Sequence, residues 1–130
     1  MDKLPKPNGL EITLPWPPTV NTYYRMVTID GSARMLISAQ GRSYARAVEA
    51  IAGGVGRIDG EVAVEIAVHL PDHRKRDIDN LLKASLDALT KAGVWRDDSQ
   101  IKDLRIRVAG MDRPHGRLEV TITEAEQLLF

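Results

Sequence analysis

Alternating apolar and polar residues mark four segments of the chain as strands. In the clearest of them, Glu61–Leu70, four aliphatic side chains point one way while Ala63, Glu65, Ala67 and His69 point the other. The same period of two predicts the other three strands. The four predicted strands are Leu10–Leu14, Glu61–Leu70, Ile101–Val108 and Arg117–Thr123.

Two other segments have the spacing of amphipathic helices. Ser38 can cap a helix over Ala39–Ala52, which the pair Gly53-Gly54 would end. The second helix is predicted over Ile78–Ala92, with Gly93 as its stop. Its apolar stripe is Ile78, Leu81, Leu82, Leu86 and Leu89.

Turn residues divide these elements. The prolines of Pro15–Pro18 must end the first strand. Arg25–Ile29 and Arg34–Ser38 flank an Asp-Gly-Ser turn, which predicts an exposed hairpin. We expect Gly110–Gly116 to join the last two strands as a loose hairpin. The tyrosines of Asn21–Arg25 could pack over a sheet edge, or this segment could contact phosphates.

These elements predict an α+β fold, in which a mixed sheet of about four or more strands carries two main helices on one face. With 130 residues and 43% hydrophobic content, we expect one domain over residues 1–130. Residues 1–9 would be a loose lead-in and residues 124–130 a C-terminal tail.

Composition excludes several classes of protein. The absence of cysteine rules out disulfides and Cys-ligated metal, so a metal would be held by oxygen or histidine. No run approaches the roughly 18 apolar residues of a membrane span, and the N-terminus lacks a signal-peptide core. We therefore expect a soluble, cytoplasmic protein that has no membrane partner.

The formal net charge is zero, but the charges are unevenly placed. The segments Arg25–Arg57 and Lys102–Arg117 each carry about +3, and acids gather around Asp77 and Asp98. A basic surface around an acidic pocket suits an enzyme that acts on a polyanion, although a solvated mixed surface would give the same counts.

The most distinctive stretch runs from Asp72 to Lys83. Its basic run comes directly before two acids, Asp77 and Asp79, and a further pair of acids follows the second predicted helix. The basic run is His73, Arg74, Lys75 and Arg76, and the later acids are Asp97 and Asp98. This order of charges predicts a metal site that faces a phosphate.

Phosphodiester hydrolysis needs a cation to polarise the phosphoryl oxygen and activate water, and Mg²⁺ prefers oxygen ligands. Asp77, Asp79 and Asp98 could supply them. Residues at i and i+2 diverge on a helix, so Asp77 should lie in an extended approach and Asp79 in the first turn. Lys83, one turn further on, could neutralise developing charge.

Each residue also has an ordinary structural explanation. Asp77 could cap the helix, and Asp79 and Lys83 could form an i,i+4 ion pair. Asp97 and Asp98 could be turn residues. His73 and Asn80 could simply face solvent, or Asn80 could orient a carboxylate.

The combination of motifs is more specific than any single residue. From about Leu10 to Glu124, the chain closely resembles the RusA family of Holliday junction resolvases. The matching stretches are Leu14–Pro18 with Asn21 and Tyr23–Arg25, Pro71-Asp72 through Arg76–Leu81, Asp87–Trp95, Asp97-Asp98 and Gly116–Thr123.

The resemblance implies a RusA-like fold and a homodimeric, Mg²⁺-dependent endodeoxyribonuclease that needs no organic cofactor, with Mn²⁺ as an expected substitute for Mg²⁺. Its partner would be four-way junction DNA, resolved by paired symmetric nicks. Carried over by motif, Asp77, Asp79 and Asp98 correspond to the catalytic metal ligands and Lys83 to an essential lysine, while Asp97 has a weaker claim. The basic run would bind DNA phosphates.

Two other functions compete with this one. The same basic run would serve a junction-binding protein without activity, whose acids act only as caps and turns. A metal-dependent phosphohydrolase acting on nucleotides fits the small size, but the chain lacks a phosphate-cradling glycine loop.

Overall fold

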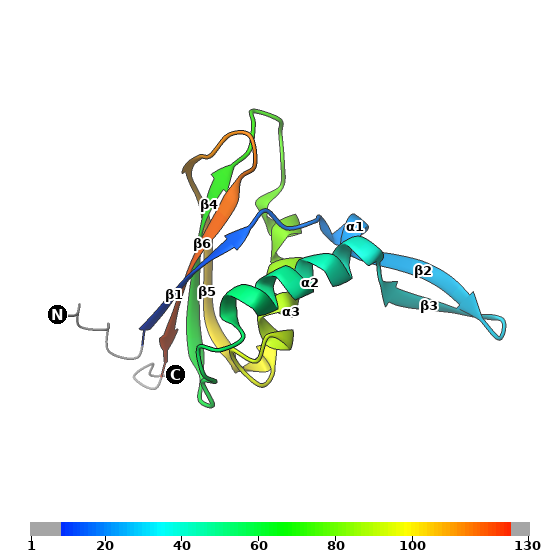
Figure 1. Cartoon of the computed structure of the whole chain (residues 1–130), viewed down its shortest axis with the longest axis horizontal. Coiled ribbons are helices and arrows are strands. Elements are labelled where there is room, and N and C mark those ends of the chain that lie inside the picture. The colour runs from blue at the N-terminus through cyan, green and yellow to red at the C-terminus, as the bar shows by residue number, and fades with distance from the viewer. Residues whose placement is uncertain (1–8, 126–130) are drawn as a thin grey trace.

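The computed structural model describes residues 9–125 and confirms the predicted α+β class. One four-stranded mixed sheet carries α2 and α3 on the same face, and a separate two-stranded arm projects beyond them (Figure 1). The elements are β1 (Gly9–Pro15), α1 (Val20–Tyr23), β2 (Tyr24–Ile29), β3 (Ser32–Ile37), α2 (Ala39–Ala52), β4 (Val62–Leu70), the 3₁₀ helix η1 (Ile78–Leu81), α3 (Leu82–Lys91), the 3₁₀ helix η2 (Asp98–Gln100), β5 (Ile101–Met111) and β6 (Arg117–Glu124).

The predicted lead-in and tail, residues 1–9 and 124–130, lie outside the described residues except at Gly9 and at residues 124–125, and Gly9 and Glu124 belong to strands. Within the described part of the chain, no helix is long and apolar enough to cross a membrane.

The strand order is β1-β6-β4-β5, and only the β4–β5 pair is parallel. The predicted hairpin at Gly110–Gly116 is therefore wrong, because β6 pairs with β4 and β1 instead of with β5. The connection from β5 to β6 passes the end of β4, where the backbone N–H of Asp112 donates to the carbonyl of Leu70 at 2.8 Å. Alternation shows which face of a strand is buried, but it does not show which strands are neighbours.

The core lies between the sheet and the two helices. The predicted inward-facing residues of β4 are at most 1% exposed, and those of β6 lie beside them in register. The helices contribute Tyr44, Val48, Leu81, Ala84, Ala88 and Leu89 to the same core. Each fully buried large aliphatic side chain stabilises the fold by about 1.5–3 kcal/mol. This packing therefore holds the start of the second helix in place against the sheet.

The segment predicted as one helix over Ile78–Ala92 is divided in the structure. It begins with η1, a 3₁₀ turn, and continues as the α-helix α3. Apolar spacing of three and four residues suits either kind of helix, so the pattern could not separate them. Gly93, with φ of 85°, ends the helix as predicted.

The predicted hairpin arm is present as β2 and β3. Asp30 and Gly31 turn the chain with φ of 52° and 80°. As predicted, the Ser38 hydroxyl caps α2, since it accepts a hydrogen bond from the backbone N–H of Gly41 at 3.0 Å. The short helix α1, between Pro18 and the arm, was not predicted.

α1 is attached to α3 by a side-chain hydrogen bond. The hydroxyl of Tyr23, which is fully buried, donates to the carboxylate of Asp87, and Lys91 approaches the same carboxylate at 3.3 Å. Burial, followed by this hydrogen bond, raises the pKa of Tyr23 well above its usual range. The bond fixes the segment after Pro18 relative to the second helix.

Removing this hydroxyl should destabilise the fold. We expect Tyr23→Phe to lower the free energy of unfolding by about 1.5–3 kcal/mol, because a hydrogen bond to a charged group is lost. Tyr24→Phe is the matched control, since its hydroxyl bonds to no described residue, and its effect should stay within about 0.5 kcal/mol. Urea denaturation measures both, and equal losses in the two variants would contradict this role of Tyr23.

Candidate functional site

Asp77 and Asp79 lie where the loop after β4 enters η1. Asp77 has φ of −91° and ψ of 115°, while Asp79 lies within the first turn. The predicted arrangement, with one acid in an extended approach and one in the helix, is therefore present. Asp77 occupies the cap position but makes no side-chain cap hydrogen bond, so capping does not account for its carboxylate.

Both carboxylates are exposed and unpaired among residues 9–125. Lys83 is exposed as well, and the i,i+4 ion pair with Asp79 that the sequence allowed does not form. Nearby acids behave differently, because Asp72 and Asp87 are both paired with cations. The two aspartates and the lysine are thus available to a ligand.

Asp98 lies apart from these groups. It begins η2, beyond the far end of α3, and a helix of 10 residues spans about 15 Å. Among the described residues, no group of three or more acids or histidines is close enough to hold a metal. One chain therefore brings Asp77 and Asp79 to one end of α3 and Asp98 to the other.

Asp97 has a structural role. Its carboxylate accepts a hydrogen bond from the backbone N–H of Ser99 at 2.9 Å and forms a capping box with Gln100. Hydrogen bonds from the side chain and then the backbone of Ser99 lower the pKa of Asp97. This is the turn role that the sequence allowed for Asp97, and Asp98 has no such partner within residues 9–125.

The basic run divides into one fixed and three exposed side chains. Arg76 is held by Asp72 through hydrogen bonds of 2.6 and 3.0 Å, and its guanidinium carbon lies 5.4 Å from the ring centroid of Trp16. His73, Arg74 and Lys75 are exposed. Asp72 and Arg76 therefore form a structural clamp over Trp16. The three exposed side chains are better placed to contact a phosphate.

The clamp stays charged over a wide pH range. The hydrogen bond from Arg76, with help from the backbone N–H of Arg74, holds the pKa of Asp72 well below its usual range. Because the lowered pKa belongs to an acid, the interaction weakens only when the pH falls through that low value.

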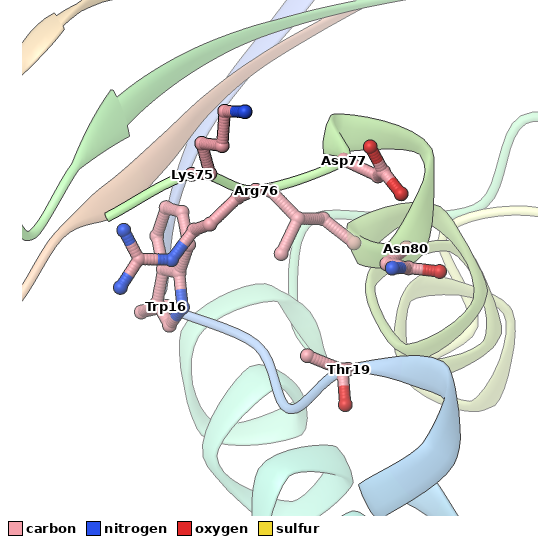
Figure 2. Close-up of a pocket in the computed structure, with 7 residues that line it drawn as sticks. Trp16, Thr19, Lys75, Arg76, Asp77 and Asn80 are labelled. Atoms are coloured by element: carbon pink, nitrogen blue, oxygen red, sulfur yellow. The ribbon is translucent and has the colours of Figure 1, made fainter. Parts of the chain in front are cut away.

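A pocket of about 370 Å³ opens beside Asp77. It lies between the segment Trp16–Thr19 and the loop that enters η1 (Figure 2). Asn80 and Leu81 line it from η1, and Lys75 lies at its edge. Sequence reasoning did not assign Trp16 or Thr19 to the site, although both belong to or adjoin the proline-rich motif noted above.

The donors present fit a hard divalent cation. Asp77 and Asp79 offer unpaired carboxylate oxygens, and Mg²⁺ takes oxygen ligands while keeping several waters and substrate oxygens. An α+β fold with such acids beside exposed cations suits one class of protein, the enzymes that act on phosphodiesters.

Comparison with known proteins gives the family. The model of the family "Endodeoxyribonuclease RusA" matches residues 15–123, so the chain belongs to the RusA family. A crossover junction endodeoxyribonuclease RusA of Enterobacteria phage 82 is 48% identical over 120 residues, which is 90% of this chain and 96% of that protein. The protein of the same name from Escherichia coli K12 is 45% identical over 121 residues, and that from Shigella sonnei is 46% identical over 120, each with the same coverage.

Breaking the clamp should change the surroundings of one tryptophan only. In Asp72→Asn, Arg76 loses its bidentate partner, so the NMR signals of the Trp16 indole should shift while those of buried Trp95 stay in place. In the unsubstituted protein the Trp16 signals should hold from pH 7 down to about pH 4, the ordinary pKa of an aspartate. A Trp16 signal that ignores the substitution would refute the clamp.

Proposed function

We propose that this protein is a Mg²⁺-dependent endodeoxyribonuclease that resolves four-way DNA junctions by paired symmetric nicks. We further propose that residues 1–130 form one RusA-like domain and that it works as a homodimer in the cytoplasm, where bacterial and phage DNA is found. Its family membership supports the reaction. The observation that carries the site is the pair of unpaired carboxylates beside exposed cations.

The geometry favours catalysis over binding alone. An unpaired carboxylate beside the basic side chains that approach DNA would repel phosphate and weaken binding. A metal ion between the carboxylate and the phosphate would remove this repulsion. Asp77 makes no cap hydrogen bond that would give it another purpose. A junction-binding protein without activity would gain affinity by losing this charge, so the acid is better explained by chemistry.

Asp77 and Asp79 would hold the cation at the start of η1. When bound, Mg²⁺ polarises the phosphoryl oxygen, lowers the pKa of the attacking water and stabilises the leaving oxygen. Lys83, exposed one turn beyond Asp79, can neutralise charge that develops on the phosphate. Arg74 and Lys75 would bind neighbouring phosphates, so affinity should fall steeply as salt rises.

A second copy would complete the site. Asp98 lies at the opposite end of α3 from Asp77 and Asp79, so a two-fold partner aligned antiparallel along α3 would bring its Asp98 to the first chain's pair. A junction has two strands to cut, and a two-fold enzyme presents two identical sites to them.

β5 offers an apolar surface for this contact. It is an edge strand of 11 residues that touches η1, and its register places Leu104 and Val108 beside buried Val64 and Val68 of β4. Those two β5 residues are nevertheless 40% and 49% exposed. An apolar strip on the helix-bearing face of an edge strand is a liability unless it is covered, and the incomplete site points to a second copy as the cover.

The first test removes one carboxylate charge. We expect Asp77→Asn to lower the rate of junction cleavage at least about 100-fold while junction binding stays the same or tightens, because a metal ligand and a repulsive charge are both lost. Glu65→Gln is the control, since Glu65 is exposed on the opposite face of the sheet and should retain full activity.

The assay uses Mg²⁺ with a labelled four-way junction, a linear duplex and a free nucleotide, and gel shifts measure binding. Symmetric nicks in the junction alone support the proposal. Full cleavage by Asp77→Asn would remove Asp77 from the site, whereas tight binding by a folded wild-type protein without nicks would favour the junction-binding alternative. Hydrolysis of the free nucleotide would favour the phosphohydrolase.

The second test asks whether the site is shared between two chains. Co-expressed Asp77→Asn and Asp98→Asn chains form mixed dimers, in which a shared arrangement leaves one site intact and the other doubly substituted. We expect each variant alone to be inactive and the purified mixed dimer to nick one of the two strands. No recovery in the mixed dimer would place Asp98 in the same site as Asp77 of its own chain, whereas full activity of Asp98→Asn alone would place Asp98 outside the chemistry.

A further inference from the structure

The pocket beside Asp77 has polar groups that the fold itself does not use. The side-chain amide of Asn80 bonds to no described residue, although it lines the pocket. An amide carries both a donor and an acceptor. Across from it, the Thr19 hydroxyl lies within 3.2 Å of the Thr22 hydroxyl and still has capacity for another bond. Figure 2 shows both side chains at the pocket, on two different segments.

The apolar wall of the pocket is held in place before any ligand binds. Leu81 is 2% exposed, and Trp16 lies under the guanidinium of Arg76, which Asp72 fixes in turn. Trp16 also packs against the backbone at Gly116, where an added Cβ would lie 2.7 Å from the indole ring. A preformed aromatic wall binds a flat ligand without the cost of ordering side chains.

We propose that this pocket receives one unstacked nucleotide of the junction, next to the phosphate that is cut. The base would lie against the part of Trp16 that faces the pocket and that Arg76 leaves uncovered, and its edge would be read by Thr19 and Asn80. Lys75, at the pocket edge, would contact a phosphate of the same strand. This inference rests on the proposed nuclease function, because Asp77 lines the same pocket and places it beside the reacting phosphate.

The size and the lining of the pocket suit a nucleotide. The volume of about 370 Å³ is within the roughly 300–1,000 Å³ of small-ligand sites. An aromatic wall combined with one amide and one hydroxyl is the chemistry by which proteins read an extruded base. Bases at a junction crossover can leave the stack at lower cost than bases inside a duplex. The pocket would therefore select the position of the cut.

Photocrosslinking tests occupancy without requiring cleavage. Junctions that carry 5-iodo-2′-deoxyuridine at one position near the crossover are bound to the full chain in EDTA, with a gel shift confirming binding. Irradiation should link Trp16 to the iodinated base at one position beside the cut, as mass spectrometry of the peptides would show. A junction that is bound but crosslinks to Trp16 from no position would overturn the proposal.

Mapping of the cuts tests the reading of the base. Asn80→Asp replaces an amide donor with a carboxylate oxygen, so the preference among cut positions in a mobile junction should change by roughly tenfold. Asn21→Asp is the matched control, because it adds the same charge on exposed α1 outside the pocket. It should weaken cleavage equally at every position.

The outcomes separate the pocket from the nuclease proposal. If Asn80→Asp lowers all cuts in proportion, as Asn21→Asp does, Asn80 does not read the base and the inference fails. If Mg²⁺ produces no cuts at all, the nuclease function fails, and the crosslink in EDTA still reports whether a base enters the pocket.

Discussion

The burial of η1 and α3 against the sheet is the constraint on which the site depends. Leu81, Ala84, Ala88 and Leu89 are at most 2% exposed, and they fix the first turn of this segment against β4 and its neighbours. Asp77 and Asp79 gain nothing from the fold, since neither carboxylate is paired within the described chain. Apolar packing therefore holds in place the charges that a ligand is to use.

Around this helix, the paired charges support the fold and the unpaired charges are left for a ligand. Asp72 and Arg76 neutralise each other and support Trp16, and Asp87 is shared by Tyr23 and Lys91. These interactions position the two walls of the pocket from segments far apart in the sequence. The charges that remain unpaired, among them Asp77, Asp79 and Lys83, are those for which phosphate chemistry has a use.

Much of this arrangement could be predicted from the sequence. Alternation located the four strands of the sheet, and the Asp-Gly turn located the arm, because these signals are local. The neighbours of β6 could not be predicted, since pairing depends on contacts between distant segments. The separation of Asp77 from Asp98 was missed for a similar reason: the helix between them was predicted, but whether the chain after it brings Asp98 back toward Asp77 depends on tertiary packing. The pocket joins Trp16 to Asn80, and only tertiary structure brings these together.

Binding of a divalent cation is the most direct test of whether Asp77 and Asp79 form a metal site, because it does not depend on DNA. Titration of the full-length protein with Mn²⁺, followed by the electron paramagnetic resonance signal of the free ion, should reveal a site in the wild type and in Glu65→Gln. We expect Asp77→Asn and Asp79→Asn each to lose that site while remaining folded. Unchanged binding of Mn²⁺ by both aspartate variants would contradict this assignment.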